Sequence, residues 1–516
     1  MPQPESIRRG RVVMLCHTDF GPDSRVVKQA RSMSERGWEV IVLATGNVVK
    51  GLDLRGARVL VIEVDRLLLT PRQLVRTPLL RPPLTNPAGV RRAEYFAELR
   101  AAQIDDLRYR RLAIEARRPG LSEIRLKVLR GRTLLARVRH RISVFRLDRT
   151  RKLLQRRRAA VSPIDRATRA FWQFALGKRA WRRLWPGIWA QERAYGPVIN
   201  RLRPDIIHAN DFMMLAVGAR AKLRAQKAGR DLKLVWDARE YLPGMSPWSA
   251  HPDWSPAHIA LEREFAPYAD AVVTVSEPLG DLLRRDYHLS EQPAVVLNAP
   301  AIQDPPVVCS TDVRTECGLA AGTPLIVYSG AAAPQRGLEV MIEALPHLPG
   351  VHTAFVVLAP HRKKVPPYVQ SLLDLAESLG VRDRVHILRY VGIDEVVSFL
   401  STGDLGVFPG LPFLNHTISL ITKFLEYSHA RLPIVVSNLK HMADTVRETG
   451  QGEVFEVEDV ASYVVAIKKV LADRDRYVAA YDDPGRMAAW EWSQQADVLE
   501  AVYTQMMNSS KGRADG

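Results

Sequence analysis

Arg336 lies in a turn that ends in glycine and directly follows an apolar run of the sequence. The run PLIVYSG (324–330) has the length and β-branched content of a buried strand, and the turn AAAPQRG (331–337) comes next. A helical pattern, LEVMIEAL (338–345), begins after the turn. Backbone N–H groups there, together with Gly330 and Arg336, would bind an anion such as a diphosphate. The turn is neither a P-loop nor a G-x-G-x-x-G motif, so an ordinary turn with a solvated arginine is the competing interpretation.

A second set of polar residues precedes a later strand. The segment 411–438 contains a short helical pattern with Lys423 and Glu426, followed by the strand pattern PIVVS (433–437). A carboxylate at this place would accept hydrogen bonds from both hydroxyls of a ribose. The same spacing also suits a simple surface ion pair on a helix. Both segments would lie near the carboxyl ends of parallel strands, where such sheets bind ligands.

The elements that position these residues form two series. Short β-branched runs alternate with helical patterns, with seven strand runs in the first series and five in the second. This alternation predicts an α/β protein with two doubly wound, Rossmann-like domains that face a cleft. The proline-rich segment NAPAIQDPPVV (298–308) separates the series and marks the domain boundary. The predicted units are a first domain (1–304), a second domain (305–485), and a C-terminal helix that crosses back to the first domain and ends in a disordered tail (486–516).

The basic residues are concentrated in one region. The chain of 516 residues has a net charge of +18, and Arg100–Arg183 holds 26 basic and 6 acidic residues. Strand patterns stop between about residues 66 and 197, which predicts a helical insertion in the first domain. Apolar residues alternate with arginines there, and the stretch ends in four tryptophans, Trp172, Trp181, Trp185 and Trp189. This pattern predicts docking on an anionic membrane, with a helical hairpin whose charged face is merely solvated as the alternative. No nucleic-acid-binding motif accompanies the charge, so we expect no nucleic-acid partner.

The remaining composition bears on the compartment and on cofactors. Three cysteines are too few for a disulfide framework, and the start MPQPESIRRGR lacks the apolar stretch of a signal peptide. No apolar run is long enough to span a bilayer. We therefore expect a cytoplasmic protein, peripheral at the inner face of the cell membrane. No His or Cys cluster has ligand spacing, so we expect no metal and no bound cofactor.

Several segments, taken together, resemble the glycosyltransferase family 4 enzymes, which have the GT-B fold. The segment SGAAAPQRGLEVMIEAL is similar to the family's phosphate turn, and NHTISLITKFLEYSHARLPIV is similar to its nucleotide-sugar segment. In the first half, segments 23–44, 236–244 and 269–283 follow the family pattern in the same order. The resemblance covers nearly the whole chain except the insertion.

The resemblance implies a retaining glycosyltransferase that moves a sugar from a nucleotide-diphosphate sugar to an acceptor hydroxyl on a lipid-linked or membrane-proximal glycan. It implies that Arg336, His208 and Asn210 are catalytic. The implied donor site consists of Gly330, Arg336, Asn415, Ser419, Leu420, Lys423 and Glu426. The implied acceptor site consists of Asp23, Arg25, Asp211 and Glu240. A histidine at a strand end is as often a buried structural residue, so both interpretations of His208 stay open.

The sequence departs from the family pattern at two donor-site positions. The first glutamate of the family's Glu-x7-Glu motif is Ile418 here, and the arginine of its Gly-Arg pair is Ala331. The sugar contact is then missing or comes from Asn415 or His416. These departures support an alternative of another class, a catalytically inactive GT-B protein that serves as a membrane- or polyanion-binding scaffold.

Overall fold

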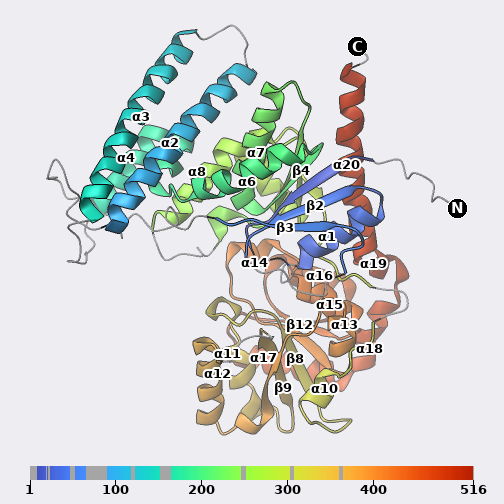
Figure 1. Ribbon diagram of the computed structural model, residues 1–516. Coiled ribbons are helices and arrows are strands. Elements are labelled where there is room, and N and C mark those ends of the chain that lie inside the picture. The colour runs from blue at the N-terminus through green and yellow to red at the C-terminus, as the bar shows by residue number, and fades with distance from the viewer. Residues whose placement is uncertain are drawn as a thin grey trace.

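The computed structural model describes residues 9–18, 20, 24–46, 53–64, 90–117, 123–151, 164–245, 252–302, 307–359 and 364–514. Figure 1 shows two α/β domains, one above the other, with the first domain at the top. Each contains one parallel sheet with helices packed against it. The predicted arrangement of two doubly wound domains is therefore confirmed.

The first sheet has seven parallel strands in the order β3-β2-β1-β4-β5-β6-β7. They are β1 (Arg11–Leu15), β2 (Glu39–Ala44), β3 (Arg58–Val61), β4 (Ile206–Asn210), β5 (Lys233–Ala238), β6 (Ala271–Thr274) and β7 (Ala294–Val295). The strand order reverses at β1, which lies between β2 and β4. Such a switch point opens a crevice beyond the carboxyl ends of the strands, and the candidate site lies there.

The second sheet has six parallel strands in the order β10-β9-β8-β11-β12-β13. They are β8 (Leu325–Ser329), β9 (His352–Leu358), β10 (Val385–Arg389), β11 (Leu405–Phe408), β12 (Ile434–Ser437) and β13 (Gly452–Phe455). The last of these, β13, was not among the predicted strands. Strands β8, β11 and β12 are buried along their whole length, which explains why their sequences are continuous apolar runs rather than alternating ones.

Helices cover both sheets. In the first domain these are α1 (Ser24–Glu35), α6 (Ile188–Leu202), α7 (Asp211–Lys227), α8 (Trp254–Phe265) and α9 (Glu277–Tyr287). In the second domain they are α10 (Val313–Glu316), α11 (Glu339–Glu343), α12 (Pro367–Ser378), α13 (Val396–Leu400), α14 (Leu414–Ile418), α15 (Thr422–His429), α16 (Lys440–Thr449), α17 (Val460–Ala472), α18 (Arg474–Val478) and α19 (Pro484–Ala489).

The C-terminal helix α20 (Trp492–Ala514) packs on the first domain, as the red helix in Figure 1 shows. Trp492 and Tyr503 share a core cluster with residues of β1 and β2, and the indole of Trp492 donates a hydrogen bond to Ser32 at 2.8 Å. The tail that was predicted to be disordered continues this helix as far as Ala514. The predicted boundary between residues 304 and 305 lies outside the described residues.

In the described part of the chain, five α-helices lie between β3 and β4 in the sequence. Besides α6, they are α2 (Val90–Arg117), α3 (Glu123–Arg151), α4 (Ile164–Leu176) and α5 (Trp181–Leu184). The long helices α2 and α3 form an antiparallel hairpin at one side of the first domain (Figure 1). Buried ion pairs attach α2 to the domain, because Asp106 contacts Arg182 at 2.8 Å and Arg220 at 3.0 Å. Among the described residues, no helix combines the length and the apolar character needed to cross a bilayer.

The four tryptophans of this region do not form an exposed border. Trp181 and Trp189 are buried in the core of the first domain, and Trp172 and Trp185 pack partly against it. The indole of Trp181 donates a hydrogen bond to Glu264 at 2.7 Å. The prediction of an aromatic membrane border made of these residues is therefore wrong, because they pack inward onto the first domain.

Candidate active site

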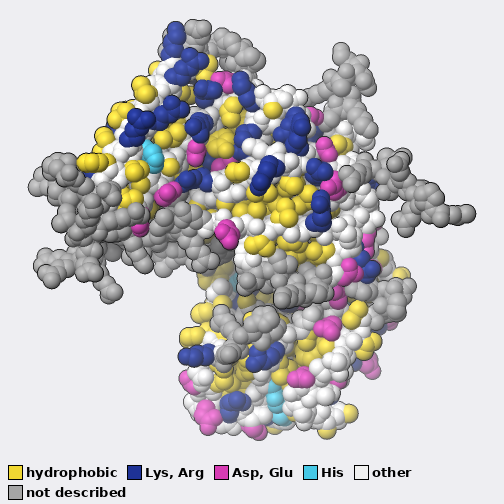
Figure 2. Space-filling view, viewed as in Figure 1, with side chains coloured by type: hydrophobic (Ala, Val, Ile, Leu, Met, Phe, Trp, Pro, Cys, Tyr) yellow, Lys and Arg dark blue, Asp and Glu magenta, His cyan; other side chains and the backbone are white. Residues whose placement is uncertain are grey.

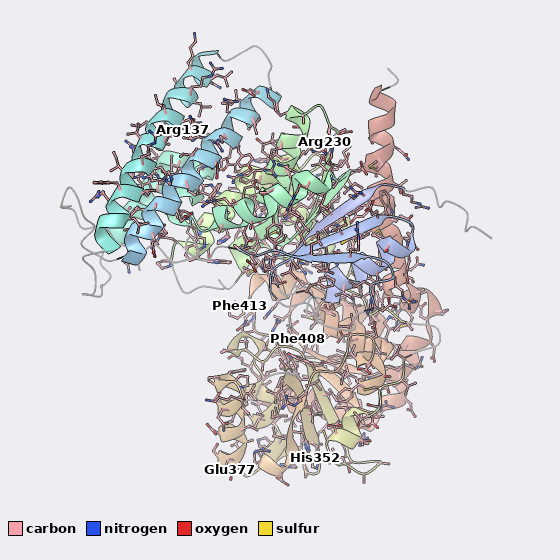
Figure 3. All side chains as sticks on the ribbon, in the orientation of Figure 1. Arg137, Arg230, His352, Glu377, Phe408 and Phe413 are labelled. Atoms are coloured by element: carbon pink, nitrogen blue, oxygen red, sulfur yellow. The ribbon has the colours of Figure 1, made fainter. Side chains whose placement is uncertain are left out.

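A cleft of about 600 Å³ lies between the two domains, beyond the carboxyl ends of both sheets. Figure 3 labels Phe408 and Phe413 at this junction, and both line the cleft. Predicted site residues from both domains meet there, namely Arg25, Asp211, Glu240, Gly330, Arg336, Asn415, Ser419, Leu420 and Lys423.

Arg336 is held at the cleft by a histidine. It ends the turn Pro334–Arg336 after β8, and its Nη1 donates a hydrogen bond to Nε2 of His416 at 3.0 Å. Nδ1 of His416 lies 2.9 Å from the carbonyl oxygen of Leu411, so Nδ1 carries the proton and Nε2 is the acceptor. Burial and then the charge of Arg336 lower the pKa of His416. Neutral His416 therefore fixes the guanidinium, which also lies 5.7 Å from the ring centre of Phe408.

The helix that was predicted to follow this turn is shorter than expected. The predicted pattern 338–345 gives only α11, followed by the 3-10 turn Leu345–His347. Gly337 has a φ of +61°, and a Cβ there would lie 2.6 Å from the carbonyl oxygen of Pro409, so the turn requires glycine. A helix of five residues offers little dipole to an anion. The positive groups on this wall of the cleft are instead Arg336 and those at the start of α15.

The start of α15 supplies the second positive group. Leu420, Thr422 and Lys423 line the cleft at the N-terminus of this helix. The ammonium group of Lys423 donates a hydrogen bond to Oε2 of Glu426 at 2.8 Å. Glu426 is buried and stands behind Lys423 rather than among the lining residues.

Glu240 joins the first domain to the second. It follows β5, and its Oε2 accepts a hydrogen bond from Nδ2 of Asn415 at 2.7 Å. The backbone N–H of Tyr241 donates to Oδ1 of the same asparagine at 3.1 Å. Burial, followed by the nearby charge of Asp211, raises the pKa of Glu240 to about 7, against the opposing charge of Arg336. The carboxyl group of Glu240 can therefore exchange a proton near neutral pH.

Arg25 reaches the cleft, but a buried network uses its guanidinium group. Its Nε and Nη2 donate to the two carboxylate oxygens of Asp237 at 2.8 and 3.0 Å, and Nη1 donates to the carbonyl oxygen of Val296 at 2.7 Å. Burial raises the pKa of Asp237, but the charge of Arg25 and hydrogen bonds from His208 and Arg25 outweigh it and hold that pKa well below its usual value. Arg25 thus lines the cleft while its guanidinium group holds the buried carboxylate beneath it; its predicted role as an acceptor ligand stays a prediction.

Two residues predicted to be catalytic lie away from the cleft. His208 is fully buried; its Nδ1 lies 2.6 Å from the hydroxyl of Tyr503 in α20, and its Nε2 lies 3.5 Å from Asp237. Asn210 is also fully buried, and neither polar atom of its side chain has a partner in the described part of the chain. Neither residue lines the cleft, which corrects their predicted catalytic role. Asp23 lies outside the described residues.

The sequence patterns do not single out several other residues that line the cleft. They include Arg239, Asn298, Tyr328, Gln335, Phe408, Phe413 and Thr422. Several directly follow or end a strand, and this place in a parallel sheet is the signal that would have found them. Among the described residues, no three His, Cys, Asp or Glu side chains gather as metal ligands.

Two family models match the chain, one in each domain. The model described as Glycosyltransferase Family 4 matches residues 132–299, and the model described as Glycosyl transferases group 1 matches residues 311–483. The two matches meet in the region of the linker and between them cover both sheets except β1 to β3.

Curated relatives match a smaller part of the chain. A GDP-mannose-dependent alpha-(1-6)-phosphatidylinositol monomannoside mannosyltransferase of Mycobacterium tuberculosis is 28% identical over 184 residues, which is 34% of this chain and 46% of the relative. A D-inositol 3-phosphate glycosyltransferase of Geodermatophilus obscurus is 26% identical over 201 residues, 38% of this chain and 43% of that protein. The matched part thus spans less than half the length of these relatives.

Solved structures match almost the whole chain in fold. Sucrose-phosphate synthase from Thermosynechococcus elongatus superposes with a TM-score of 0.61 at 12% identity, covering 97% of this chain and 100% of that one. Anabaena HepE in complex with UDP and glucose gives 0.58 at 13% identity, with coverages of 96% and 100%. The chain therefore has the two-domain GT-B fold, and its two domains are similar to the Glycosyltransferase Family 4 and Glycosyl transferases group 1 models.

Proposed function

We propose that this chain transfers a sugar from a nucleotide-diphosphate sugar to an acceptor hydroxyl, with retention of the anomeric configuration. The observation that carries the proposal is the position of Arg336, which His416 orients at a cleft between the two domains, with Lys423 on the same wall. Two cations and the N-terminus of α15 around one cavity suit a diphosphate.

The donor diphosphate lies against the second domain. Arg336 and Lys423 neutralise its charge, and the backbone at Gly330 and at Ser419–Leu420 approaches the phosphate oxygens. Glu426 does not line the cleft, which corrects its predicted role as the ribose ligand; it accepts a hydrogen bond from Lys423 and so holds that ammonium group beside the phosphates. As the bond to the sugar breaks, the leaving diphosphate gains negative charge. Cations that are already in position stabilise this state more than the ground state, so no metal ion is required for that role.

The acceptor lies against the first domain, where Asp211 and Glu240 line the cleft. Because the pKa of Glu240 is raised to about 7, its carboxylate is a good hydrogen-bond acceptor for the attacking hydroxyl near neutral pH. The names of the curated relatives include a phosphatidylinositol mannoside and an inositol phosphate as acceptors. Together with the basic region 100–183, this favours an inositol-containing or lipid-linked acceptor at an anionic membrane surface.

Release of nucleoside diphosphate from a panel that includes GDP-mannose and UDP-glucose tests the transfer. We expect one donor to be consumed faster when an acceptor such as inositol phosphate or phosphatidylinositol is added. Arg336→Ala serves as the active-site control, and Arg447→Ala, on the exposed part of α16, as the matched surface control. The departures from the family pattern at Ala331 and Ile418 favour the alternative of a catalytically inactive GT-B protein that serves as a scaffold. Absence of release with every donor and acceptor would establish the scaffold.

A further inference from the structure

The outer helix of the insertion, α3, has two apolar stripes, one that faces α2 and one whose side chains are largely exposed. The stripe that faces α2 recurs at spacings of three and four residues and consists of Leu126, Leu129, Thr133, Ala136, His140, Ser143 and Leu147, none of them exposed. Leu129 and Ala136 are fully buried, and Nδ1 of His140 lies 3.1 Å from the carbonyl oxygen of Ala97 in α2. This stripe accounts for the hairpin.

The second stripe lies on the opposite side of α3 and faces away from α2. It contains Val128, Leu135, Val138, Ile142 and Phe145, at spacings of seven, three, four and three residues. Each of these side chains is between 48% and 54% exposed, and the adjoining Leu134 is 64% exposed. A row of large apolar side chains at helical spacing on a surface marks an interaction site rather than scattered exposure.

Arginines border the second stripe. Between Arg125 and Leu147 the helix carries eight basic residues and no acidic one. Arg125, Arg132 and Arg139 recur at every seventh position along one edge, and Arg130 and Arg137 lie along the other. Figure 2 shows hydrophobic side chains between dark blue ones over this part of the molecule, and Figure 3 labels Arg137 on α3. Long arginine side chains beside an apolar row can keep their charge at a polar boundary while their carbon atoms lie on an apolar phase.

We propose that this outer face of α3 binds an anionic lipid bilayer, with the helix lying in the plane of the headgroups and its second stripe buried among the acyl chains. The proposal rests on the proposed function and identifies the surface that brings the enzyme to a membrane-proximal acceptor. A second copy of the chain is a poor occupant, because two such helices would bring arginine rows against each other. Helix α3 is also unsuited to cross the bilayer, because arginines interrupt its apolar residues at every turn.

The attachment of the hairpin makes docking mechanically relevant to the cleft. The buried contacts of Asp106 with Arg182 and Arg220 fix α2 to α5 and α7, and α7 begins with the cleft residue Asp211. Figure 1 shows the hairpin at the side of the first domain and apart from the second domain. A bilayer bound to α3 would therefore hold the acceptor domain, while the donor domain could still move against it.

Vesicle binding of the full chain tests the proposal. Wild-type protein is mixed with vesicles of phosphatidylcholine alone, or of phosphatidylcholine and phosphatidylglycerol at roughly 7:3, and the bound fraction is measured by flotation at low and high salt. We expect strong binding only with phosphatidylglycerol. The variant Leu135→Gln/Val138→Gln/Ile142→Gln leaves the α2-facing stripe intact and should reduce the partition coefficient about tenfold or more. Arg132→Gln/Arg139→Gln should remove most of the salt-dependent part of binding.

Val465→Gln is the matched control, because Val465 is an exposed apolar residue on α17 of the second domain. It should bind as the wild type does. The proposal would be overturned if the triple glutamine variant, with its helix content unchanged, bound the vesicles as strongly as the wild type does. It would also be overturned if the wild type bound equally to vesicles with and without phosphatidylglycerol. A wild-type dimer that the triple variant converts to a monomer would assign the face to a second copy. Sugar transfer to a water-soluble acceptor, measured without vesicles, is independent of these results, so its absence would contradict only the proposed function.

Discussion

Asn415 of the second domain donates a hydrogen bond to Glu240 of the first domain, with 2.7 Å between Nδ2 and Oε2. The same asparagine accepts from the N–H of Tyr241, so its side chain connects the domains by both of its polar atoms. Beside it, the hydroxyl of Ser276 donates to the carbonyl oxygen of Ile418 at 2.7 Å. Helix α14 is thereby held against the acceptor domain, and the state of Glu240 affects both the cleft and the domain junction.

The charge of Glu240 should make the stability of the protein depend on pH. The folded-state pKa of about 7 lies above the ordinary value of 4.5, so the neutral carboxyl group favours the fold. This contribution is fully present below about pH 4.5 and is lost as the pH rises from there through about 7. Glu240→Gln remains neutral, so the difference between its free energy of unfolding and that of the wild type should grow over this range and stay constant at higher pH. Urea unfolding at several pH values measures this, and parallel curves would contradict it.

Loss of Arg336 should affect the chemical step. Arg336→Ala is expected to lower kcat by on the order of a hundredfold, as the removal of one positioned electrostatic contact does. Arg336→Lys should recover only part of this loss, because a lysine lacks the planar donor group that reaches Nε2 of His416. Steady-state release of nucleoside diphosphate gives both values. A wild-type kcat in Arg336→Ala would contradict the proposed placement of the diphosphate beside Arg336.

His416 should produce an acid limb in the pH profile. Its pKa lies below the usual 6.5, so it is neutral at neutral pH and accepts the hydrogen bond from Arg336. Below that pKa the protonated ring cannot accept and repels the guanidinium, so kcat/KM should fall as the pH falls. In His416→Gln an amide oxygen takes the place of Nε2, so the further fall below pH 6.5 should disappear, while the limb that Glu240 gives near pH 7 remains and activity at neutral pH stays within about tenfold of the wild type. An unchanged limb in this variant would assign it to another group.

The pair of Arg25 and Asp237 should be costly to break. Both side chains are fully buried and lie 2.8 Å apart. In Asp237→Ala the guanidinium would keep its charge without the carboxylate, so the free energy of unfolding should fall by about 3 to 5 kcal/mol. Thermal or urea unfolding measures the loss. Asp444→Ala, which removes an exposed ion pair on α16, is the matched control and should cost less than about 1 kcal/mol.

The sequence contained enough information to predict the sheets and much of the donor wall. Strands such as β8 and β11 are continuous apolar runs, because both faces are covered, and the polar residues that follow them meet at one edge. Arg336 and Lys423 were found in this way. The contact between Arg336 and His416 joins a turn to helix α14 across 80 residues of sequence, and no local pattern reports such a pair.

The errors at His208 and at the tryptophans have one physical origin, which is burial by a distant segment. His208 ends a strand as a catalytic residue would, but the hydroxyl of Tyr503, 295 residues away, takes its Nδ1. The tryptophans follow a basic stretch as in a membrane-surface helix, but Trp181 is enclosed by Trp189 and Phe265. In both cases the type of the residue is compatible with exposure and with burial, and only the tertiary contact decides.

The position of α20 has a consequence for the order in which the chain folds during translation. Domains generally fold in the order in which they leave the ribosome. Here the first domain is synthesised first, yet its core lacks Trp492 and Tyr503 until the last part of the chain emerges. Ser32 and His208 then have no partner for the indole and hydroxyl contacts they make in the finished protein. We therefore expect the second domain to reach its native state on the ribosome before the first domain. In a nascent chain stalled before α20, only the second domain should be protected from protease.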